Sequence, residues 1–232
     1  MTVVAESFAH NSVPGGGNKT DGLDEDCVVS LPSGTVNNDY LLAAYMQESE
    51  ATLGALPSAF VSGLFMTVDP TGTSGQHGRI AGKVASSEPS THTFQMSDDG
   101  NAFLSRFSGV NLSDPINASA HTASGSGTSS TPQSPEVTTD VDGCLIIYGL
   151  SWAGDSISEL VSAPAGTSMI AEGDDAGERP AMVMYAKIQA TAGPTGTGDW
   201  ETSVADRYAA FTIALAPAVA GGVVRQMMQY SV

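Results

Sequence analysis

The sequence predicts an all-β protein, a jelly-roll-like antiparallel β-sandwich, and three observations support this prediction. Glycine and proline, at 26 and 12 of 232 residues, divide the chain into short segments. The segments between these breaks are rich in β-branched and aromatic residues, and patterns typical of helices are scarce. Apolar residues make up 41% of the chain, enough to fill a core. A chain of this length suits a single sandwich, and we expect residues 1–217 to form it.

The stretch 79–110 shows the strand pattern most clearly. Residues 80–85 alternate apolar with small or polar side chains, and 91–96 resume an extended pattern after a loop that contains Glu88-Pro89. A turn is predicted at 98–101, because Asp, Asn and Gly tolerate positive φ and bond to their own backbone. A further strand, 102–110, follows this turn.

The remaining strands are predicted from the same signals. A hairpin is expected around Asp142-Gly143, a strong short-range turn signal. Residues 156–161 are expected to form a short helix or a strand, and 47–55 a helical turn or a loop. The other expected strands are 2–8, 27–31, 40–46, 60–68, 137–140, 144–152, 181–190 and 208–215.

The two halves of the chain show a weak similarity. Tyr40 precedes Lys83 by 43 positions, and Cys144 precedes Lys187 by 43 positions, and each pair spans comparable apolar runs. We interpret this as two related β-layers of one domain, because solenoid repeats are shorter. The alternative is a coincidence of strand patterning.

Charge and hydropathy narrow the function classes. The net charge is −17, with only 8 Lys plus Arg. Binding to a phosphate backbone needs clustered basic residues, so neither nucleic acid nor an anionic membrane surface is an expected partner. The first residues lack the basic and apolar regions of a signal peptide, and the apolar stretch 211–224 is interrupted by Pro217, Gly221 and Gly222. No membrane insertion is expected.

Cys27 and Cys144 are the only cysteines, and their separation matches no metal-binding motif. Cys144 lies in an apolar run, which is typical of a small buried residue. A disulfide between the two is the alternative.

The sequence contains no catalytic motif. The four histidines lie in separate segments, and none belongs to an HExxH motif or stands beside a cysteine. We therefore expect a protein that is not an enzyme and needs no cofactor.

Acidic loops are the candidate metal sites, because Ca²⁺ prefers carboxylate and amide oxygens. Their spacing differs from that of an EF-hand, and turn chemistry on a solvated surface is the favoured interpretation. Two aromatic residues, Trp152 and Trp200, are candidates for stacking on a sugar, with a core position as the favoured alternative. The candidate ligand residues for Ca²⁺ are Asp98, Asp99 and Asn101, Asp174, Asp175 and Glu178, and the acidic residues of 21–26.

Several segments together resemble a loosely defined group of β-sandwich proteins found among bacteriophage virion components and bacterial surface proteins. The group shares a first strand, a hairpin with a Glu-Pro turn, a Gly-Val stretch and a closing apolar strand. The resemblance covers about residues 28–217, but the usual Gly-Trp after Pro57 is absent and His92 replaces the usual tyrosine. The matching segments are GTVNNDYLL (34–42), KVASSEPSTHTF (83–94), FSGV (107–110), DPI (114–116), PEVTT (135–139) and AFTIAL (210–215).

This resemblance implies a non-enzymatic virion structural protein exposed on the particle, as a head decoration or spike or as a tail-associated adhesin. Such a subunit is assembled in the host cytoplasm and associates with itself, as a trimer, and with other virion proteins; a host surface glycan is a further expected ligand. Residues 218–232 are expected to form an extended strand or arm. The alternatives are a carbohydrate-binding module of a surface or secreted protein, and a hydrolase on the same scaffold.

Overall fold

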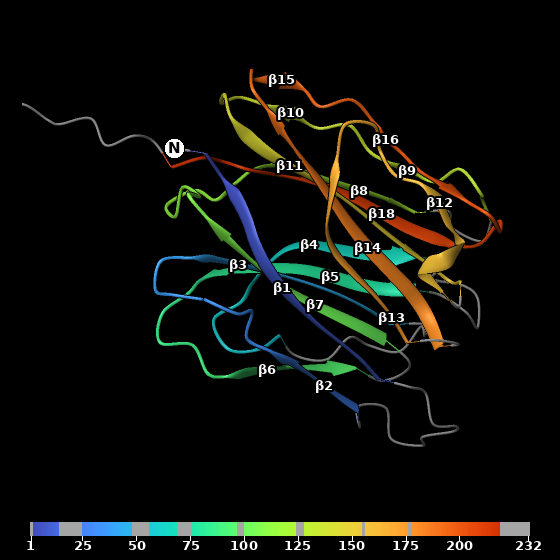
Figure 1. Ribbon diagram of the computed structural model, residues 1–232, viewed down its shortest axis with the longest axis horizontal. Coiled ribbons are helices and arrows are strands. Elements are labelled where there is room, and N and C mark those ends of the chain that lie inside the picture. The colour runs from blue at the N-terminus through green and yellow to red at the C-terminus, as the bar shows by residue number, and fades with distance from the viewer. Residues whose placement is uncertain are drawn as a thin grey trace, which may run out of the picture.

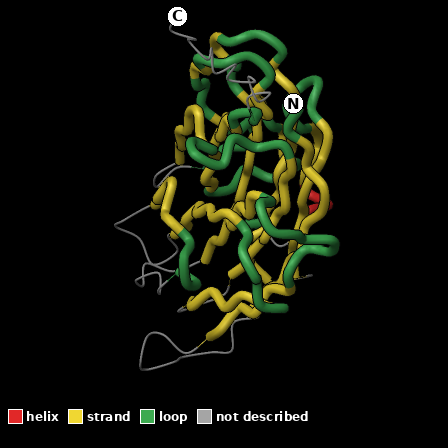
Figure 2. Tube along the Cα trace, turned by 90° about the vertical axis from the view of Figure 1, so that its left-hand side faces the viewer, coloured by secondary structure: helices red, strands yellow, loops and turns green. Residues whose placement is uncertain are grey.

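The computed structural model describes residues 2–13, 25–47, 56–68, 76–96, 100–123, 128–154, 156–175 and 178–218. Nearly all of the regular structure is β, and the one helical element in this part of the chain is a 3₁₀ turn, η1 (Ile157–Glu159), drawn in red in Figure 2. The predicted all-β sandwich is confirmed. No described helix is long and apolar enough to cross a membrane.

Two five-stranded antiparallel sheets form the centre of the molecule (Figure 1). Sheet 1 has the order β1-β7-β3-β5-β4, and sheet 2 has the order β13-β14-β11-β18-β8. The strands of sheet 1 are β1 (Val4–Val13), β3 (Tyr40–Gln47), β4 (Val61–Val68), β5 (Gln76–Val84) and β7 (Gly100–Ser108). The strands of sheet 2 are β8 (Ile116–Ala123), β11 (Cys144–Trp152), β13 (Ser168–Asp175), β14 (Glu178–Gln189) and β18 (Tyr208–Leu215).

Each sheet comes from one half of the chain: half 1 (4–108) forms sheet 1, and half 2 (116–215) forms sheet 2. The two sheets have the same strand order. When only the five strands of a sheet are counted, in the order in which they occur along the chain, both sheets have the order first-fifth-second-fourth-third from one edge to the other. The first sheet strand of each half lies beside the third sheet strand of the other half: β1 lies beside β13, and β8 lies beside β4. Lys83 pairs with Leu41, and Lys187 pairs with Ile146. The equal spacings align Leu41 with Leu145, one residue before Ile146, so the two lysines hold nearly equivalent positions in their sheets. The predicted pair of related halves is therefore confirmed by the topology.

Short two-stranded ribbons cover the outer faces. In both halves, the connection between the first and second strands pairs with the connection between the fourth and fifth. From bottom to top, Figure 1 shows the ribbon of half 1, sheet 1, sheet 2 and the ribbons of half 2. The ribbons are β2 (Glu25–Ser30) with β6 (Thr91–Met96), β9 (Gln133–Ser134) with β16 (Gly198–Asp199), β10 (Thr138–Thr139) with β15 (Gly193–Pro194), and β12 (Leu160–Ser162) with β17 (Glu201–Thr202).

This layering explains the apolar runs of the central strands. Every residue of β3 is buried, because Leu42 and its neighbours of the same parity face sheet 2, while Leu41 and its neighbours face the β2–β6 ribbon. Strand β11 is buried in the same way, with Ile147 in the core between the sheets and Ile146 under the outer ribbons of half 2. A strand buried on both faces has no polar face, so its sequence shows no alternation.

The structure corrects several expected connections. Strand β6 forms no hairpin with either neighbour in sequence but pairs with β2. The turn at Asp142-Gly143 exists, with Gly143 at φ +78°, yet the strands that flank it pair with other partners. Strand β8 was missed because its sequence, INASAHTA, is mostly small and polar. The acidic stretch 173–178, expected to be a loop, contains the ends of β13 and β14, where Asp175 pairs with Glu178.

Candidate functional site

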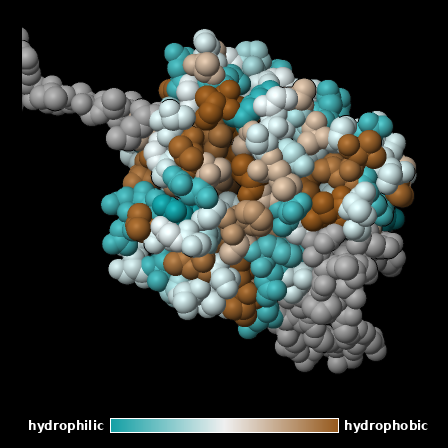
Figure 3. Space-filling model, viewed as in Figure 1, coloured by the Kyte–Doolittle hydropathy of each residue, from teal (hydrophilic) through white to brown (hydrophobic). Residues whose placement is uncertain are grey.

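A hollow with exposed apolar side chains around it lies where β1 and β13, the edge strands of the two sheets, come together. Among the described residues, each of these strands pairs with a neighbour on one side alone. Three large apolar side chains along them are exposed: Val4 at 45%, Phe8 at 41% and Met169 at 46%. Figure 3 shows apolar surface along this seam, interrupted by polar patches. Unpaired strand edges with exposed apolar residues are uncommon in proteins that act as free monomers.

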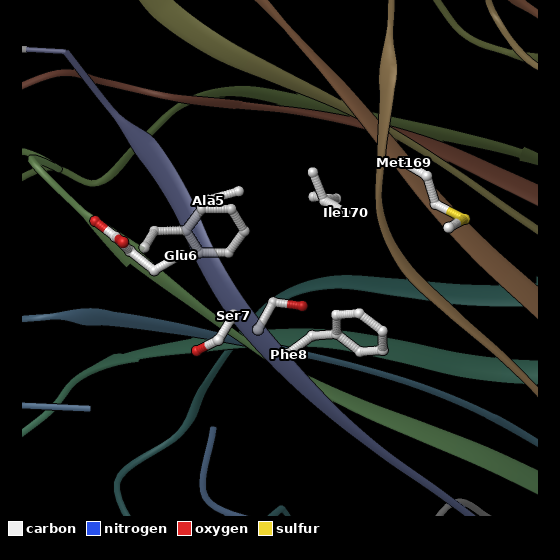
Figure 4. Close-up of a pocket in the computed structure, with 8 residues that line it drawn as sticks. Ala5, Glu6, Ser7, Phe8, Met169 and Ile170 are labelled. Atoms are coloured by element: carbon white, nitrogen blue, oxygen red, sulfur yellow. The ribbon is translucent and has the colours of Figure 1, made fainter. Parts of the chain in front are cut away.

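A hollow of about 380 Å³ lies between the two edges (Figure 4). We call it the edge groove. Phe107, which belongs to the core between the sheets, forms part of its wall, so the groove extends to the margin of that core. The residues that line it are Ala5, Glu6, Ser7, Phe8, Ser105, Phe107, Met169 and Ile170.

Irregular pairing of both edge strands shapes the groove. The register of β1 on β7 shifts between Ala5 and Ser7, and the register of β13 on β14 shifts between Met169 and Ala171. The residues left over, Glu6 and Ile170, both line the groove. A bulge bends its strand and redirects side chains, so these two bulges set the form of the opening.

One polar atom in the groove lacks a partner. Ser105 is 2% exposed, and its Oγ makes no hydrogen bond within the described protein. A buried hydroxyl without a partner costs about 1–3 kcal/mol. A ligand that brings a hydrogen-bonding group into the groove would remove this cost.

A second region, beside the loop after β5, contains a buried ionic cluster. Glu88 Oε2 accepts a hydrogen bond from Lys83 Nζ at 2.9 Å, and Glu88 Oε1 accepts one from the Ser86 amide at 2.8 Å. His92 Nε2 lies 3.2 Å from Glu88 Oε2, close enough for attraction but without the alignment of a hydrogen bond. The side chains of Glu88 and His92 are only 3% and 4% exposed.

The electrostatics of this cluster favour a charged Glu88 and a neutral His92. Burial opposes the charge of Glu88, but the hydrogen bonds from Lys83 and the Ser86 amide, with the positive charges nearby, lower its pKa on balance. Burial lowers the pKa of His92, and the charge of Glu88 offsets this only in part. Phe60 packs against the cluster, with its ring 5.4 Å from the His92 ring and 5.3 Å from Lys83 Nζ.

Strained backbone surrounds the same cluster. Ala59 and Ser87 have φ of 67° and 53°, in the left-handed region that non-glycine residues rarely adopt. Both line a hollow of about 410 Å³ with Glu88 and His92. Lys83 and the Ser86 amide satisfy both oxygens of Glu88, whereas His92 Nε2 is buried without a hydrogen bond. We interpret the cluster as a clamp that holds the loop.

The predicted metal ligands receive no support from the described part of the chain, where no group of three or more His, Cys, Asp or Glu could hold a metal ion. Asp98 and Asp99 lie outside the described residues, as do 21–24, and nothing is established for the side chains of Asp174, Asp175 and Glu178. Asn101 lies in the core, where its amide contacts His10 Nε2 at 2.9 Å and donates to the Pro180 carbonyl. Calcium binding by the acidic segments stays a prediction.

The two tryptophans are core residues. Trp152 is 1% exposed and Trp200 is 2% exposed, so neither indole offers a face to a sugar. Trp152 Nε1 donates to Glu159, and Trp200 Nε1 donates to Ser134 Oγ at 2.9 Å. The core alternative is the one that this burial supports.

The cysteines are both free and buried. Cys27 lies under the β2–β6 ribbon and Cys144 under the outer ribbons of half 2, so the two sheets separate them. Burial raises the pKa of the Cys27 thiol to about 12, which leaves it unreactive at neutral pH. The disulfide alternative is wrong.

The edge groove was not predicted from the sequence. Residues 2–8 read as an ordinary strand, and only the pairing of the two sheets places Phe8 near Met169. The alternation of side chains along 2–8 gave no signal for it, because the bulge at Glu6 puts Val4 and Phe8 on opposite faces of β1.

Comparisons with known proteins found no match to this chain among family models, curated proteins or solved structures.

Proposed function

We propose that this protein is a non-enzymatic structural subunit of a bacteriophage particle, exposed as a head decoration or as part of the tail, and that it self-associates through the edge groove. The observation that carries the association is the pair of open strand edges with their exposed apolar side chains. The assignment to bacteriophage rests on the sequence resemblance alone.

The architecture suits a subunit that works by packing. Strands that match the resembling group, such as β3 and β18, lie in the core, so these motifs account for the fold and leave the role to the surface. The surface carries a net charge of −17, which favours solubility before assembly. Against this acidic background, the groove is a place where a neighbour can bury apolar area.

The carbohydrate-binding alternative lacks the feature from which it was inferred. It needs exposed aromatic rings beside a cation site, whereas Trp152 and Trp200 are buried. Phe8 is the one aromatic side chain among the large hydrophobic residues that are exposed in the described part of the chain, and no cluster of metal ligands lies beside it there.

Two measurements test the proposal. Antibodies raised against the folded protein should label bacteriophage particles from cells that carry the gene, as seen by electron microscopy; label confined to the soluble fraction would contradict the virion role. Light scattering should give the mass of an oligomer, with a trimer expected, and a monomer at all concentrations would contradict self-association. A mass that falls on addition of EDTA would assign a structural role to Ca²⁺ in the acidic segments.

A further inference from the structure

The described chain ends beside the edge groove. Pro217 forms an antiparallel bridge with Val110, and the Ala218 amide donates to the Gly109 carbonyl at 2.7 Å. Gly109 in turn packs against the Thr2 carbonyl, just before β1 begins. Residues 219–232 therefore start at the end of β1 that carries the groove.

The chemistry of this segment complements the groove. Residues 219–232 contain one arginine and no acidic residue, in a chain with a net charge of −17. Read as a strand, 223–232 places Val224, Met228, Tyr230 and Val232 on one face. Arg225 is the one basic residue of the segment, and Glu6 is the charged residue that lines the groove.

We propose that residues 223–232 of a second copy of this chain bind in the edge groove as an added strand along β1. This inference rests on the proposed self-association and names the segment responsible. Backbone groups of the added strand pair with the edge of β1 at 5–8, where β1 lines the groove; apolar side chains cover Phe8 and Met169, and a hydrogen bond reaches Ser105 Oγ. Strand addition at an open edge is a recurrent mode of peptide recognition.

Chain direction favours a second copy over the chain's own segment. The bridge at Pro217 runs antiparallel to the end of β7, and β1 is antiparallel to β7, so the chain leaves Ala218 in the direction of β1. A segment that continued in this direction would meet β1 as a parallel strand, which is the weaker pairing per residue. A segment from a neighbour approaches from either end and is able to pair antiparallel.

Chemical cross-linking tests the proposal with the full chain. Phe8→Cys protein is mixed with Met228→Cys protein and treated with a short bismaleimide; the native Cys27 and Cys144 are buried and do not compete. A dimer should form in about tenfold higher yield than in the matched mixture with Val161→Cys, an exposed site on β12. Equal yields in the two mixtures would overturn the proposal.

The double variant Phe8→Cys/Met228→Cys decides between copies. A ladder of linked chains on a denaturing gel supports exchange between copies, and an intramolecular link alone assigns the groove to the chain's own segment and overturns the proposal.

Light scattering separates this inference from the proposed function. Removal of 223–232 and the substitution Phe8→Asp should each convert the oligomer to monomer, while Val161→Asp should leave the mass unchanged. If the wild type is an oligomer and both groove variants stay oligomeric, self-association stands and this inference fails. A wild-type monomer would contradict both.

Discussion

The two halves of the molecule have one topology but hold their outer layers by different chemistry. In half 1, the loop from β5 to the β2–β6 ribbon is fixed by the ionic cluster of Lys83, Glu88 and His92. In half 2, the equivalent connection is fixed by neutral hydrogen bonds: Trp200 Nε1 to Ser134 Oγ at 2.9 Å and Tyr148 Oη to the Thr195 carbonyl at 3.0 Å. The same arrangement of strands is thus compatible with two ways of closing an outer face.

The two equivalent lysines show the difference in a single position. Lys83 binds a carboxylate, whereas Lys187 lies 5.2 Å from the Tyr148 ring and 3.4 Å from the Thr195 carbonyl. Five residues after the lysine, half 1 has Glu88 and half 2 has Ala192, so half 2 lacks a carboxylate at the equivalent position. Half 1 should therefore respond to pH and to loss of charge, and half 2 to loss of apolar volume.

The largest expected effect is in half 2. Trp200→Ala removes a buried indole and leaves Ser134 without its donor, so the free energy of unfolding should fall by about 4 kcal/mol. Urea unfolding measures this loss, which should be the same at pH 8 and pH 5. Val204→Ala, at an exposed position nearby, is the control. A loss of similar size in this variant would show that the burial of Trp200 does not account for the effect.

Glu88→Gln should be the most damaging conservative change in half 1. It keeps the shape of the side chain but leaves Lys83 without its counter-ion, and the expected loss is about 3 kcal/mol. Glu136→Gln, an exposed position, is the matched control for the lost charge. Equal stabilities of the two variants would refute the clamp.

The clamp should also make stability depend on pH. Burial lowers the pKa of His92 from 6.5 in the folded state, so the unfolded chain binds the proton more tightly. The contribution of His92 is complete above about pH 6.5 and is lost as the pH falls through its folded pKa; that of Glu88, whose folded pKa is also lowered, is lost at more acid pH. His92→Gln should flatten the stability profile below pH 6.5.

Titration of His92 by NMR gives an independent check on this reasoning. The charge of Glu88 raises the pKa of His92, against the larger effect of burial. Glu88→Gln should therefore lower the pKa of His92 further. A rise would contradict the attraction between the Glu88 carboxylate and His92.

Sequence patterns predicted strands well where local signals agreed with burial. The apolar runs at 40–46 and 144–152 gave β3 and β11 almost to the residue, because a strand buried on both faces leaves a continuous apolar run. The connections were harder: the turn at Asp142-Gly143 is real, but it joins strands that pair elsewhere. The residues of a turn determine where the chain bends. They do not determine which distant strand pairs with the strands on either side of the turn.

The edge groove and the ionic clamp illustrate the same limit. Glu88-Pro89 was interpreted as a turn, and its neighbours Lys83 and His92 contribute because the loop folds back on itself. Phe8 and Met169 come from opposite halves, so only the packing of the two sheets brings them to one opening. Spacing within β1 could not place Phe8, because the bulge at Glu6 reverses the alternation, and it could not supply the neighbour of Phe8.

The smallest expected effect compares the two lysines directly. Lys187→Met keeps the aliphatic stem and loses a contact with the Tyr148 ring, which is worth about 0.5–1 kcal/mol. Lys83→Met also loses such a contact, with Phe60, but in addition leaves the 3%-exposed Glu88 carboxylate without its counter-ion. Lys83→Met should therefore be the more destabilising by a factor of about two or more in free energy, since an unpaired buried charge costs more than a lost ring contact. Urea unfolding of the two variants at pH 7 measures this difference directly. If the two variants lose equal free energy of unfolding, the two lysines contribute equally to stability. The outer faces of the two halves would then differ in sequence but not in the interactions that hold them.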